Sequence, residues 1–433
     1  MNDFTQKMLD FINESPTCFQ AVQNIAQKLQ KDGFCELNER KKWKIEAGKK
    51  YFVKRNASSI IAFAIPKEDF CGFSMVASHS DSPLFKIKEN PNQTEAGVVR
   101  LNAEKYGGML LFPWFDRPLS VAGRVAVFDE NAPGKIASRL VDLKKNVALI
   151  PNLAIHFDRT ANDGRKIDVQ NEMQSVISLE NGESILSLVS KSLKIDESKI
   201  LSTDLFLYNA QNGTFFGTND EFITSPRLDD LECVWTTLLG FLDSLKSLEK
   251  MQNVPIFAVF DNEEVGSGTR QGAASTFLLE TLKRVSMNCK KDEESFFVSL
   301  ANSFLVSADN AHAIHPAHTK SSDPVNAPKI NAGPVIKLSA AQKYTTDAIS
   351  FAVFRRACEN ANVPFQVFTN NSNVAGGSTL GNISQTHVSV RSVDVGLSQW
   401  AMHSPMESAG AHDPQLLYKS IEEFYKIEEF PED

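Results

Sequence analysis

Residues 256–267 read IFAVFDNEEVGS, an apolar run followed directly by acidic residues and a glycine. The apolar run predicts a buried β-strand, and the pair Glu263 and Glu264 follows it in a turn. Open α/β sheets bind their ligands at the carboxyl ends of the strands. Two neighbouring glutamates at such an edge can divide the work, one binding a metal ion and the other acting as a base. The stretch therefore predicts an α/β fold with metal-dependent chemistry at the edge of its sheet.

The same arrangement of a strand followed by a metal-binding side chain occurs elsewhere in the chain. The strand-like runs at 73–77 and 304–308 are followed closely by His79 and Asp309. A further aspartate stands at the start of a predicted helix over 228–245, and a histidine follows a predicted strand over 388–395. Five positions therefore fit a site for two metal ions, namely His79, Asp229, Glu264, Asp309 and His403.

Imidazole and carboxylate ligands together suit zinc, with manganese or cobalt as possible substitutes. Two divalent ions about 3.5–4 Å apart hold a nucleophilic water well. Asp81 stands two residues after His79, so its carboxylate can accept the free ring N–H and fix the tautomer of the histidine.

Each of these residues also has a purely structural explanation. His79 can be a buried histidine with satisfied hydrogen bonds, Asp229 can cap a helix, and Asp309 can belong to a turn. The intervals between the five positions are long, so spacing alone does not show that they converge. A third metal site at His312, His315 and His318 is disfavoured because Pro316 interrupts the helix that would align them. The glycine loop at 376–379 lacks the lysine and spacing of a P-loop, so it predicts tight packing near the site.

Size and composition indicate an ordinary soluble globular protein with one large and one smaller domain. The chain has 433 residues, of which 42% are hydrophobic and 23% charged. The net charge of −8 argues against nucleic-acid binding, and no apolar stretch is long enough to span a bilayer. The amino terminus lacks the features of a signal peptide. The six cysteines contain no Cys-x-x-Cys pair and are interpreted as reduced core residues of a cytoplasmic protein, so a metal must be held by His, Asp and Glu.

The pattern of helices and strands predicts a discontinuous catalytic domain. Alternating helix and strand signals cover residues 1–90 and 220–433. Residues 91–219 instead contain short β-like runs broken by glycine, proline and asparagine, with one helix predicted over 180–191. We therefore expect a β-rich module inserted into an α/β domain.

Taken together, these segments resemble the aspartyl aminopeptidases, the tetrahedral dinuclear zinc aminopeptidases, over nearly the whole chain. The resemblance depends on the following segments: SHSDSP at 78–83, WFDR at 114–117, PNLAIH at 151–156, SPRLD at 225–229, DNEEVGS at 261–267, SAD at 307–309, GPVIK at 333–337 and AMHS at 401–404.

The resemblance implies a role for each site residue. His79 and Asp309 would bind one zinc ion, Glu264 and His403 the other, and Asp229 would bridge the two. Glu263 would be the general base and later the proton donor, with Asp81 supporting His79. Lys337 stands where the family places a cation that faces the acidic side chain of the substrate.

The resemblance also implies an architecture and an activity. The fold would be a zinc-peptidase domain, a mixed sheet sandwiched by helices, interrupted by a β-rich dimerisation domain. Twelve subunits would form a tetrahedral shell, in which His156 reaches a neighbouring subunit's active site. The enzyme would be an exopeptidase that removes N-terminal residues, with a preference for Asp and Glu, from peptides with a free amino terminus.

Two departures and two alternatives accompany this resemblance. Residues 371–373 are Asn-Ser-Asn where the family usually has an Arg and an Asp, which puts the side-chain preference of the site in doubt. Gly381-Asn382 replaces the usual Gly-Pro. The alternative enzyme is an amidohydrolase or deacylase on the same dinuclear scaffold. The alternative of another class is a non-catalytic assembly module that has lost its metals, against which the presence of all five ligands and Glu263 argues.

Overall fold

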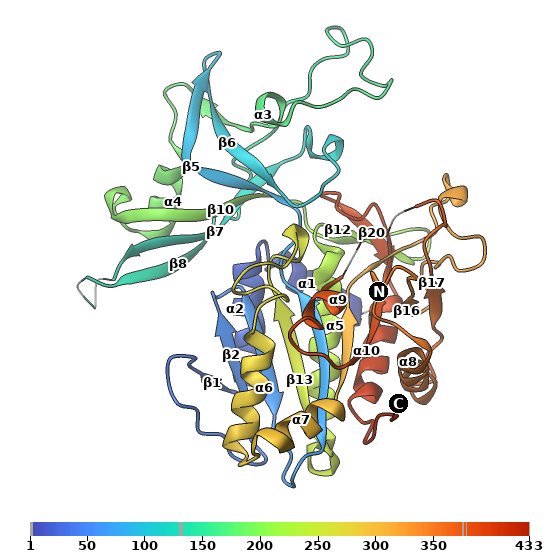
Figure 1. Cartoon of the computed structure of the whole chain (residues 1–433). Helices are drawn as coiled ribbons and strands as arrows, with labels where there is room; N and C mark the ends of the chain where they lie inside the picture. Colours follow the sequence, from blue (N-terminus) through green and yellow to red (C-terminus); the bar gives the residue numbers. More distant parts are fainter. Residues whose placement is uncertain (1–2, 130–131, 133, 375, 378, 433) are drawn as a thin grey trace. The chain divides into compact units, whose positions relative to one another are not determined.

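The chain divides into two compact units (Figure 1). The computed structural model describes residues 3–129, 132, 134–374, 376–377 and 379–432. The first unit consists of Met1–Asp81, Gly213–Met402 and Glu407–Asp433, and the second of Ser82–Asn212 and His403–Met406. The division falls at 82 and 213, whereas the sequence pattern suggested 91 and 219. The reason is that the strand β5 (Leu84–Glu95) already belongs to the sheet of the second unit.

A nine-stranded mixed sheet forms the centre of the first unit. The four inner strands β13, β4, β14 and β18 are parallel to one another. On either side of these four, β3 pairs antiparallel with β13, and β16 pairs antiparallel with β18. In spatial order the strands are β1 (Cys35–Leu37), β2 (Lys50–Arg55), β3 (Ser59–Ala64), β13 (Asn253–Phe260), β4 (Gly72–His79), β14 (Phe304–Ala308), β18 (Arg391–Gly396), β16 (Val335–Lys337) and β17 (Gln366–Phe368).

Helices cover both faces of this sheet, because side chains along each buried strand alternate between two cores. Ile60 and Ala62 of β3 belong to one apolar cluster, and Ile61 and Phe63 belong to the other. The first cluster includes α1 (Asp3–Asn13), α2 (Cys18–Lys31), α5 (Leu228–Ser244), α8 (Ala348–Asn360) and α10 (Asp413–Phe424). The second includes α6 (Phe277–Asn288), α7 (Glu293–Ala301) and α9 (Leu380–Ser384); α6 and α7 lie in front of the sheet in Figure 1.

A second, five-stranded sheet lies in the same unit. Its order is β11 (Thr214–Phe216), β12 (Phe222–Ser225), β20 (Glu407–Gly410), β19 (Ser398–Trp400) and β15 (Ala311–His312). Its strands directly precede or follow segments that contain predicted ligands, since β12 leads into α5 and β15 follows β14. Short 3₁₀ helices complete the unit at Leu245–Lys250, Glu263–Val265 and Thr319–Ser321.

The second unit is built on a six-stranded antiparallel sheet. In spatial order its strands are β8 (Ile136–Asp142), β7 (Leu119–Phe128), β10 (Ile200–Asn209), β5, β6 (Val98–Tyr106) and β9 (Val176–Leu179). It also contains α3 (Val169–Glu172), α4 (Ile185–Leu193) and 3₁₀ helices at Phe112–Trp114 and Glu197–Lys199. Gly123 of β7 has φ +144°, and a Cβ there would lie 2.0 Å from the carbonyl oxygen of Asp204, so a close approach of β7 to β10 requires glycine.

Several local expectations need correction. The helix predicted over 180–191 begins only at Ile185, because Ser184 caps it by accepting a hydrogen bond from the N–H of Ser187. All six cysteines are free, but Cys35 and Cys71 are exposed instead of belonging to a core.

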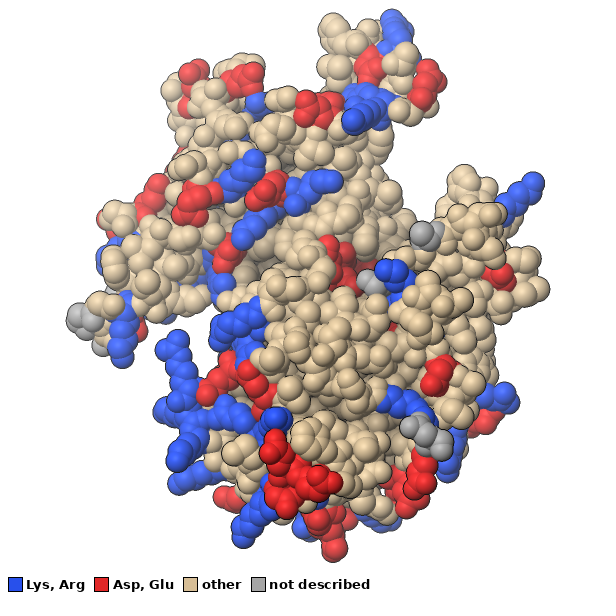
Figure 2. Space-filling model, in the orientation of Figure 1, with Lys and Arg blue, Asp and Glu red and all other residues tan. Residues whose placement is uncertain are grey.

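Acidic and basic side chains are intermixed over the face shown in Figure 2. Among the described residues, the helices are too short or too polar to cross a bilayer.

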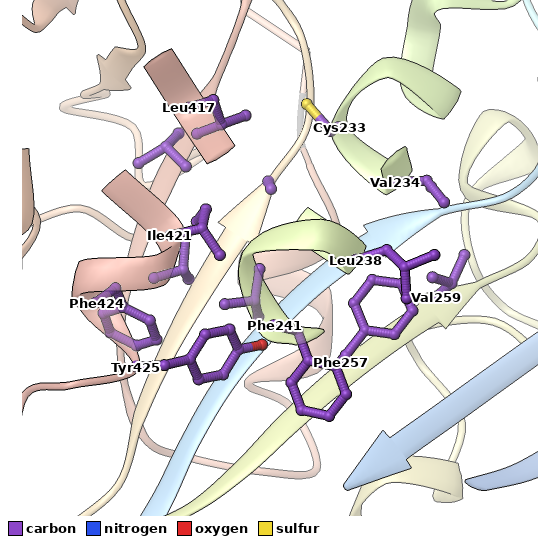
Figure 3. Close-up of a cluster of buried hydrophobic side chains, with 14 of the residues drawn as sticks. Cys233, Val234, Leu238, Phe241, Phe257, Val259, Leu417, Ile421, Phe424 and Tyr425 are labelled. Carbon is purple, nitrogen blue, oxygen red and sulfur yellow. The ribbon is translucent and has the colours of Figure 1, made fainter. Parts of the chain in front are cut away.

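Helix α5 packs between β13 and α10, and Asp229 lies at the start of this helix. Figure 3 shows Leu238 and Phe241 of α5 between Phe257 of β13 and Ile421 of α10. The rings of Phe241 and Phe257 are stacked, with centroids 5.9 Å apart. Phe241 is completely buried, so the position of α5 depends on this contact.

Replacing Phe241 by alanine should therefore destabilise the first unit. We expect Phe241→Ala to lower the free energy of unfolding by about 3–5 kcal/mol, because a large cavity would remain. Denaturant unfolding followed by circular dichroism measures this change. Phe297→Ala is the matched control, because the Phe297 side chain is 51% exposed. Equal unfolding midpoints for the two variants would contradict the prediction.

Candidate metal centre

Three adjacent strands bring the predicted site residues to one edge of the nine-stranded sheet. Strand β4 lies between β13 and β14 and is parallel to both, so the carboxyl ends of the three strands point the same way. Phe260, the last residue of β13, is paired with His79, the last residue of β4. Asp309 follows β14 directly. Residues separated by more than 200 positions in the chain therefore meet at this edge.

The turn after β13 positions the two glutamates. Asn262 has a left-handed φ of 64°, and its side-chain oxygen accepts hydrogen bonds from Thr269 and Gln271. The carboxylate of Asp81 accepts the backbone N–H of Glu263 at 3.1 Å and that of Glu264 at 3.2 Å. Asp81 therefore fixes the main chain at both glutamates through charge-assisted hydrogen bonds.

His79 is held with one ring nitrogen toward Asp81 and the other toward Asp229. Its Nδ1 lies 3.1 Å from the main-chain oxygen of Asp81 and 3.5 Å from the Asp81 carboxylate. Its Nε2 lies 3.3 Å from Oδ1 of Asp229. A proton on Nδ1 would satisfy both oxygens of Asp81, so the lone pair on Nε2 would face the carboxylates as a metal ligand requires. Burial lowers the pKa of His79, but the charge of Asp230 and the carboxylates beside the ring raise it well above its usual value.

Asp229 lies at a break in the backbone at the start of α5. Arg227 before it has a left-handed φ of 60°, and Asp229 itself has the non-helical angles φ −79° and ψ 107°. The backbone N–H of Asp229 donates to Oε2 of Glu407 at 3.0 Å. The Asp229 side chain is 3% exposed. The main chain is thus held from the side of the five-stranded sheet while the carboxylate points toward His79.

Within the first unit, the ligand atoms of the described residues form two compact groups. The groups have all their ligand atoms within 4.8 Å of one another; one contains His79, Asp229, Asp230 and Asp309, and the other contains His79, Glu263 and Glu264. Among the described residues, His312, His315 and His318 do not form such a group, although the rings of His315 and His318 are 4.9 Å apart.

Asp230 is a member of the first group that the sequence pattern did not single out. Its Oδ2 accepts the backbone N–H of His79 at 3.1 Å, and its buried Oδ1 has no hydrogen-bond partner. The available signal was the pair of adjacent aspartates at 229 and 230, of which the sequence argument used only the first. Glu407 is a second residue that was missed, because its role depends on a main-chain contact with no pattern in the sequence.

The electrostatics of the two groups favour a bound cation. Burial raises the pKa of Glu263 to about 8, and burial with the charge of Asp229 raises that of Glu264 well above its usual value. The pKa of Asp309 is also raised by burial, although the ammonium of Lys337 opposes the shift. Several carboxylates gathered out of water repel one another, and positive charge between them relieves that repulsion. One imidazole and several carboxylates are also the donors that zinc accepts, so the residues present fit this metal.

Lys337 lies behind Asp309 and is bound to its main chain. Its ammonium donates to the main-chain oxygens of Asp309 at 2.7 Å and Asn310 at 3.2 Å, and lies 3.6 Å from the Asp309 carboxylate. Burial lowers the pKa of Lys337, but the surrounding negative groups, with Asp309 contributing most, raise it by more. The pKa is therefore above its usual value, and the ammonium stays protonated. The side chain is 2% exposed, so this structure shows Lys337 supporting Asp309, and contact with a substrate stays a prediction.

The two remaining predicted histidines belong to the second unit. His403 is in the segment His403–Met406, has a left-handed φ of 68° and accepts the N–H of Leu110 at its main-chain oxygen. Its role as a ligand stays a prediction. His156 is exposed in an irregular segment, next to Phe157, whose side chain is 81% exposed.

The segment that departs from the family pattern uses its amides locally. The side-chain amide of Asn371 donates to the main-chain oxygens of Lys320 and Ser322, and its oxygen accepts the N–H of Asn373. The Asn371 side chain therefore stabilises this loop through hydrogen bonds to main chain. In the following glycine loop, Ser378 lies outside the described residues.

A mixed sheet covered by helices, with imidazole and carboxylates at the carboxyl edge of its parallel strands, is the arrangement of an α/β metallohydrolase. The chain belongs to the M18 aminopeptidases, since the family described as "Aminopeptidase I zinc metalloprotease (M18)" matches residues 11–425. The protein is thus an M18 family zinc aminopeptidase. The resemblance to this family found in the sequence motifs is confirmed.

Individual relatives agree over almost the full length. "Probable M18 family aminopeptidase 2" of Clostridium novyi (strain NT) is 44% identical over 434 residues, covering 98% of this chain and 99% of the relative. A chain in the cryo-electron microscopy structure of the Ape4 and Nbr1 complex is 37% identical with a TM-score of 0.94, covering 98% of this chain and 85% of that one. A chain of the S. cerevisiae mApe1 dodecamer is 26% identical with a TM-score of 0.85, covering 98% and 97%. The predicted mixed α/β fold is therefore confirmed.

The raised pKa values predict that zinc binding releases protons. Glu263, whose pKa burial raises to about 8, holds a proton at neutral pH in the metal-free protein. Burial also raises the pKa of Glu264, and a cation beside the two glutamates favours their ionised forms. We therefore expect proton release on zinc binding at pH 7 and a zinc affinity that falls as the pH is lowered from about 8 to 6. Titration calorimetry in two buffers with different ionisation enthalpies measures the number of protons. Identical enthalpies in both buffers would contradict this expectation, and Glu263→Gln should release fewer protons than the unaltered protein.

Proposed function

We propose that this M18 aminopeptidase uses two zinc ions per subunit to remove N-terminal residues, with a preference for Asp and Glu. The observation that carries the proposal is the convergence of His79, Asp229 and Asp309, together with Glu263 and Glu264, at one buried edge of the sheet. The family identity supports zinc as the metal. Manganese or cobalt could occupy the same donors.

The donors divide naturally into two sets around Asp229. His79 and Asp309 would hold one ion, since their ligand atoms belong to one group with Asp229. Glu264 and His403 would hold the other, and Asp229 would be shared between the two ions. Three carboxylates would then offset most of the charge of two divalent cations, which is the reason for burying them together.

Bound zinc supplies Lewis acidity, which polarises a peptide carbonyl and makes water more nucleophilic at neutral pH. Glu263 would accept the proton of the attacking water and deliver it to the departing amine. Its pKa of about 8 places it close to the working pH, as efficient transfer in both directions requires. Asp81 would keep Glu263 in place through the N–H bond at 3.1 Å.

The preference for acidic residues would come from positive charge close to the metals. Lys337 is a protonated, buried ammonium adjacent to Asp309. An Asp or Glu side chain of the substrate would be attracted to it, whereas a neutral side chain would gain nothing from the charge. The free amino group of the substrate would bind among the carboxylates, which explains why a blocked peptide would be excluded.

Assembly would complete the site. The mApe1 relative is described as a dodecamer. In the second unit of this chain, the exposed apolar residues Leu153, Ile155 and Phe157 flank His156 and are suited to being covered by another copy. We therefore propose a tetrahedral dodecamer in which this segment faces a neighbouring subunit, and we place the enzyme in the cytoplasm.

The role of Glu263 is tested by an isosteric change. Glu263→Gln should lower kcat by about 10²–10⁴-fold, because the amide cannot transfer the proton. Zinc content, measured by atomic emission, should stay at the level of the unaltered protein because Glu263 is not assigned as a ligand. Glu68→Gln at an exposed position is the control. Normal turnover by the Glu263 variant would remove the assigned role.

The role of Lys337 needs an assay that separates specificity from metal retention. Lys337→Met keeps most of the side-chain volume and removes the charge. If Lys337 attracts acidic substrates, the ratio of kcat/KM for aspartyl over leucyl substrates should fall by about tenfold or more, by analogy with the loss of other buried polar contacts. Zinc content is measured on the same samples. Loss of zinc with an unchanged ratio would show that Lys337 serves only to support Asp309.

A further inference from the structure

A continuous chain of buried hydrogen bonds connects the two segments that carry Asp229 and Asp309. The N–H of Asp229 donates to Oε2 of Glu407 at 3.0 Å, and Oε1 of Glu407 accepts from Nε2 of Gln399 at 3.3 Å. Oε1 of Gln399 accepts from Nδ2 of Asn310 at 3.0 Å. Asn310 is the neighbour of Asp309 in sequence, so the chain begins at one predicted ligand and ends beside another.

The five-stranded sheet places these three side chains. Glu407 is the first residue of β20 and is paired with Ser225 of β12, the strand that leads to Asp229. Gln399 lies on β19, next to β20. Asn310 immediately precedes β15, which pairs with β19. The three side chains are 1%, 1% and 3% exposed in the order Glu407, Gln399 and Asn310. This series of hydrogen bonds is therefore buried away from water, where the loss of a hydrogen bond costs more free energy.

Asn310 also fixes the Asp229 segment directly. Its Nδ2 lies 3.1 Å from the main-chain oxygen of Leu228 and 3.2 Å from Oε2 of Glu232, and its Oδ1 accepts from Cys233 and from the N–H of Leu397. On the other side, the main-chain oxygen of Asn310 accepts from Lys337. The contacts to Leu228 and from Lys337 involve main-chain oxygens, at Leu228 and Asn310, next to the predicted ligands Asp229 and Asp309.

We propose that the Glu407–Gln399–Asn310 chain is a positioning device that sets the separation of the Asp229 and Asp309 carboxylates, and through it the affinity for the ion they share. This inference rests on the proposed metal site. Among the described residues, Glu407 is not a member of the groups of ligand atoms around His79. Gln399 and Asn310 act through the hydrogen bonds that connect them to Glu407, so the three are positioning residues. Groups that orient metal ligands in this way contribute to affinity through geometry.

The direction of the hydrogen bonds makes the proposal specific. Glu407 accepts at both oxygens, and Gln399 donates to Glu407 while accepting from Asn310. In Glu407→Gln, the new amide would face the amide of Gln399, so a donor would meet a donor. In Gln399→Glu, two carboxylates would face each other. In the double variant, Gln at 407 can accept from Asp229 and donate to Glu at 399, which can still accept from Asn310. The exchange restores every hydrogen bond of the chain and conserves the net charge.

The experiment compares Glu407→Gln, Gln399→Glu and the double variant in the full chain, with Glu359→Gln on the exposed part of α8 as control. Zinc affinity is measured by competition with a chromogenic chelator, and ligand geometry by the visible spectrum of the cobalt-substituted protein. We expect each single change to weaken zinc binding by about 10–100-fold. The double variant should recover most of this loss and restore the cobalt spectrum, giving strong non-additivity between the two sites.

Several results would overturn the proposal. The first is an unchanged zinc affinity in both single variants, with or without a lowered melting temperature. The second is a double variant that binds zinc no better than the weaker single variant, and the third is a double variant that does not fold. If a single variant fails to fold, the double variant decides the matter by itself. Zinc binding by the unaltered protein distinguishes a failure of this inference from a failure of the proposed function. If it binds no zinc, the metal site itself is refuted, whereas normal zinc binding with unaffected variants refutes only the positioning chain.

Discussion

The repulsion between buried carboxylates at one edge of the sheet is the constraint on which the rest of this structure depends. The buried Asp229, Asp230 and Asp309 lie close to the half-buried Glu264, and burial raises the pKa values of Asp230, Glu264 and Asp309. A fold tolerates such a cluster only if positive charge compensates it and if the backbone is fixed strongly enough to resist its separation. The chain belongs to a family of zinc metalloproteases, and bound zinc would supply the compensating positive charge.

Most of the support for this cluster comes from contacts to main chain. Asp81 binds the N–H groups of Glu263 and Glu264, Asp230 binds that of His79, and Glu407 binds that of Asp229. These hydrogen bonds fix the main chain directly beside the predicted ligand side chains. The apolar packing of α5 against β13 and α10, shown in Figure 3, provides the rigid base for Asp229. Rigid elements and satisfied polar networks are the usual requirements for a site with fixed geometry.

Sequence reasoning succeeded where a residue's position followed from the local pattern. The strand before Glu263, the strands before His79 and Asp309, and the helix after Asp229 are all present, with bounds shifted by a few residues. Parallel strands share a carboxyl edge, so their ends could be expected to meet. Glu407, Gln399 and Asn310 were not found, because their contacts depend on how β12, β19 and β20 pair. Asp230 was missed although the adjacent aspartates at 229 and 230 were a signal in the sequence. The interpretation of Cys35 and Cys71 as core residues was wrong, because burial at the edge of a fold depends on what covers it.

The sequence by itself determined the fold class, the family and the candidate ligands, because apolar periodicity and motif chemistry are written locally along the chain. Only the tertiary structure decided the environment of each group. It placed Lys337 against the main chain of Asp309, turned His79 between Asp81 and Asp229, and joined Asp229 to Asn310 through Glu407 and Gln399. These contacts join residues that are far apart in sequence. Hydrogen-bond partners and charge compensation depend on distances of a few ångströms, and such distances exist only once the sheets have paired.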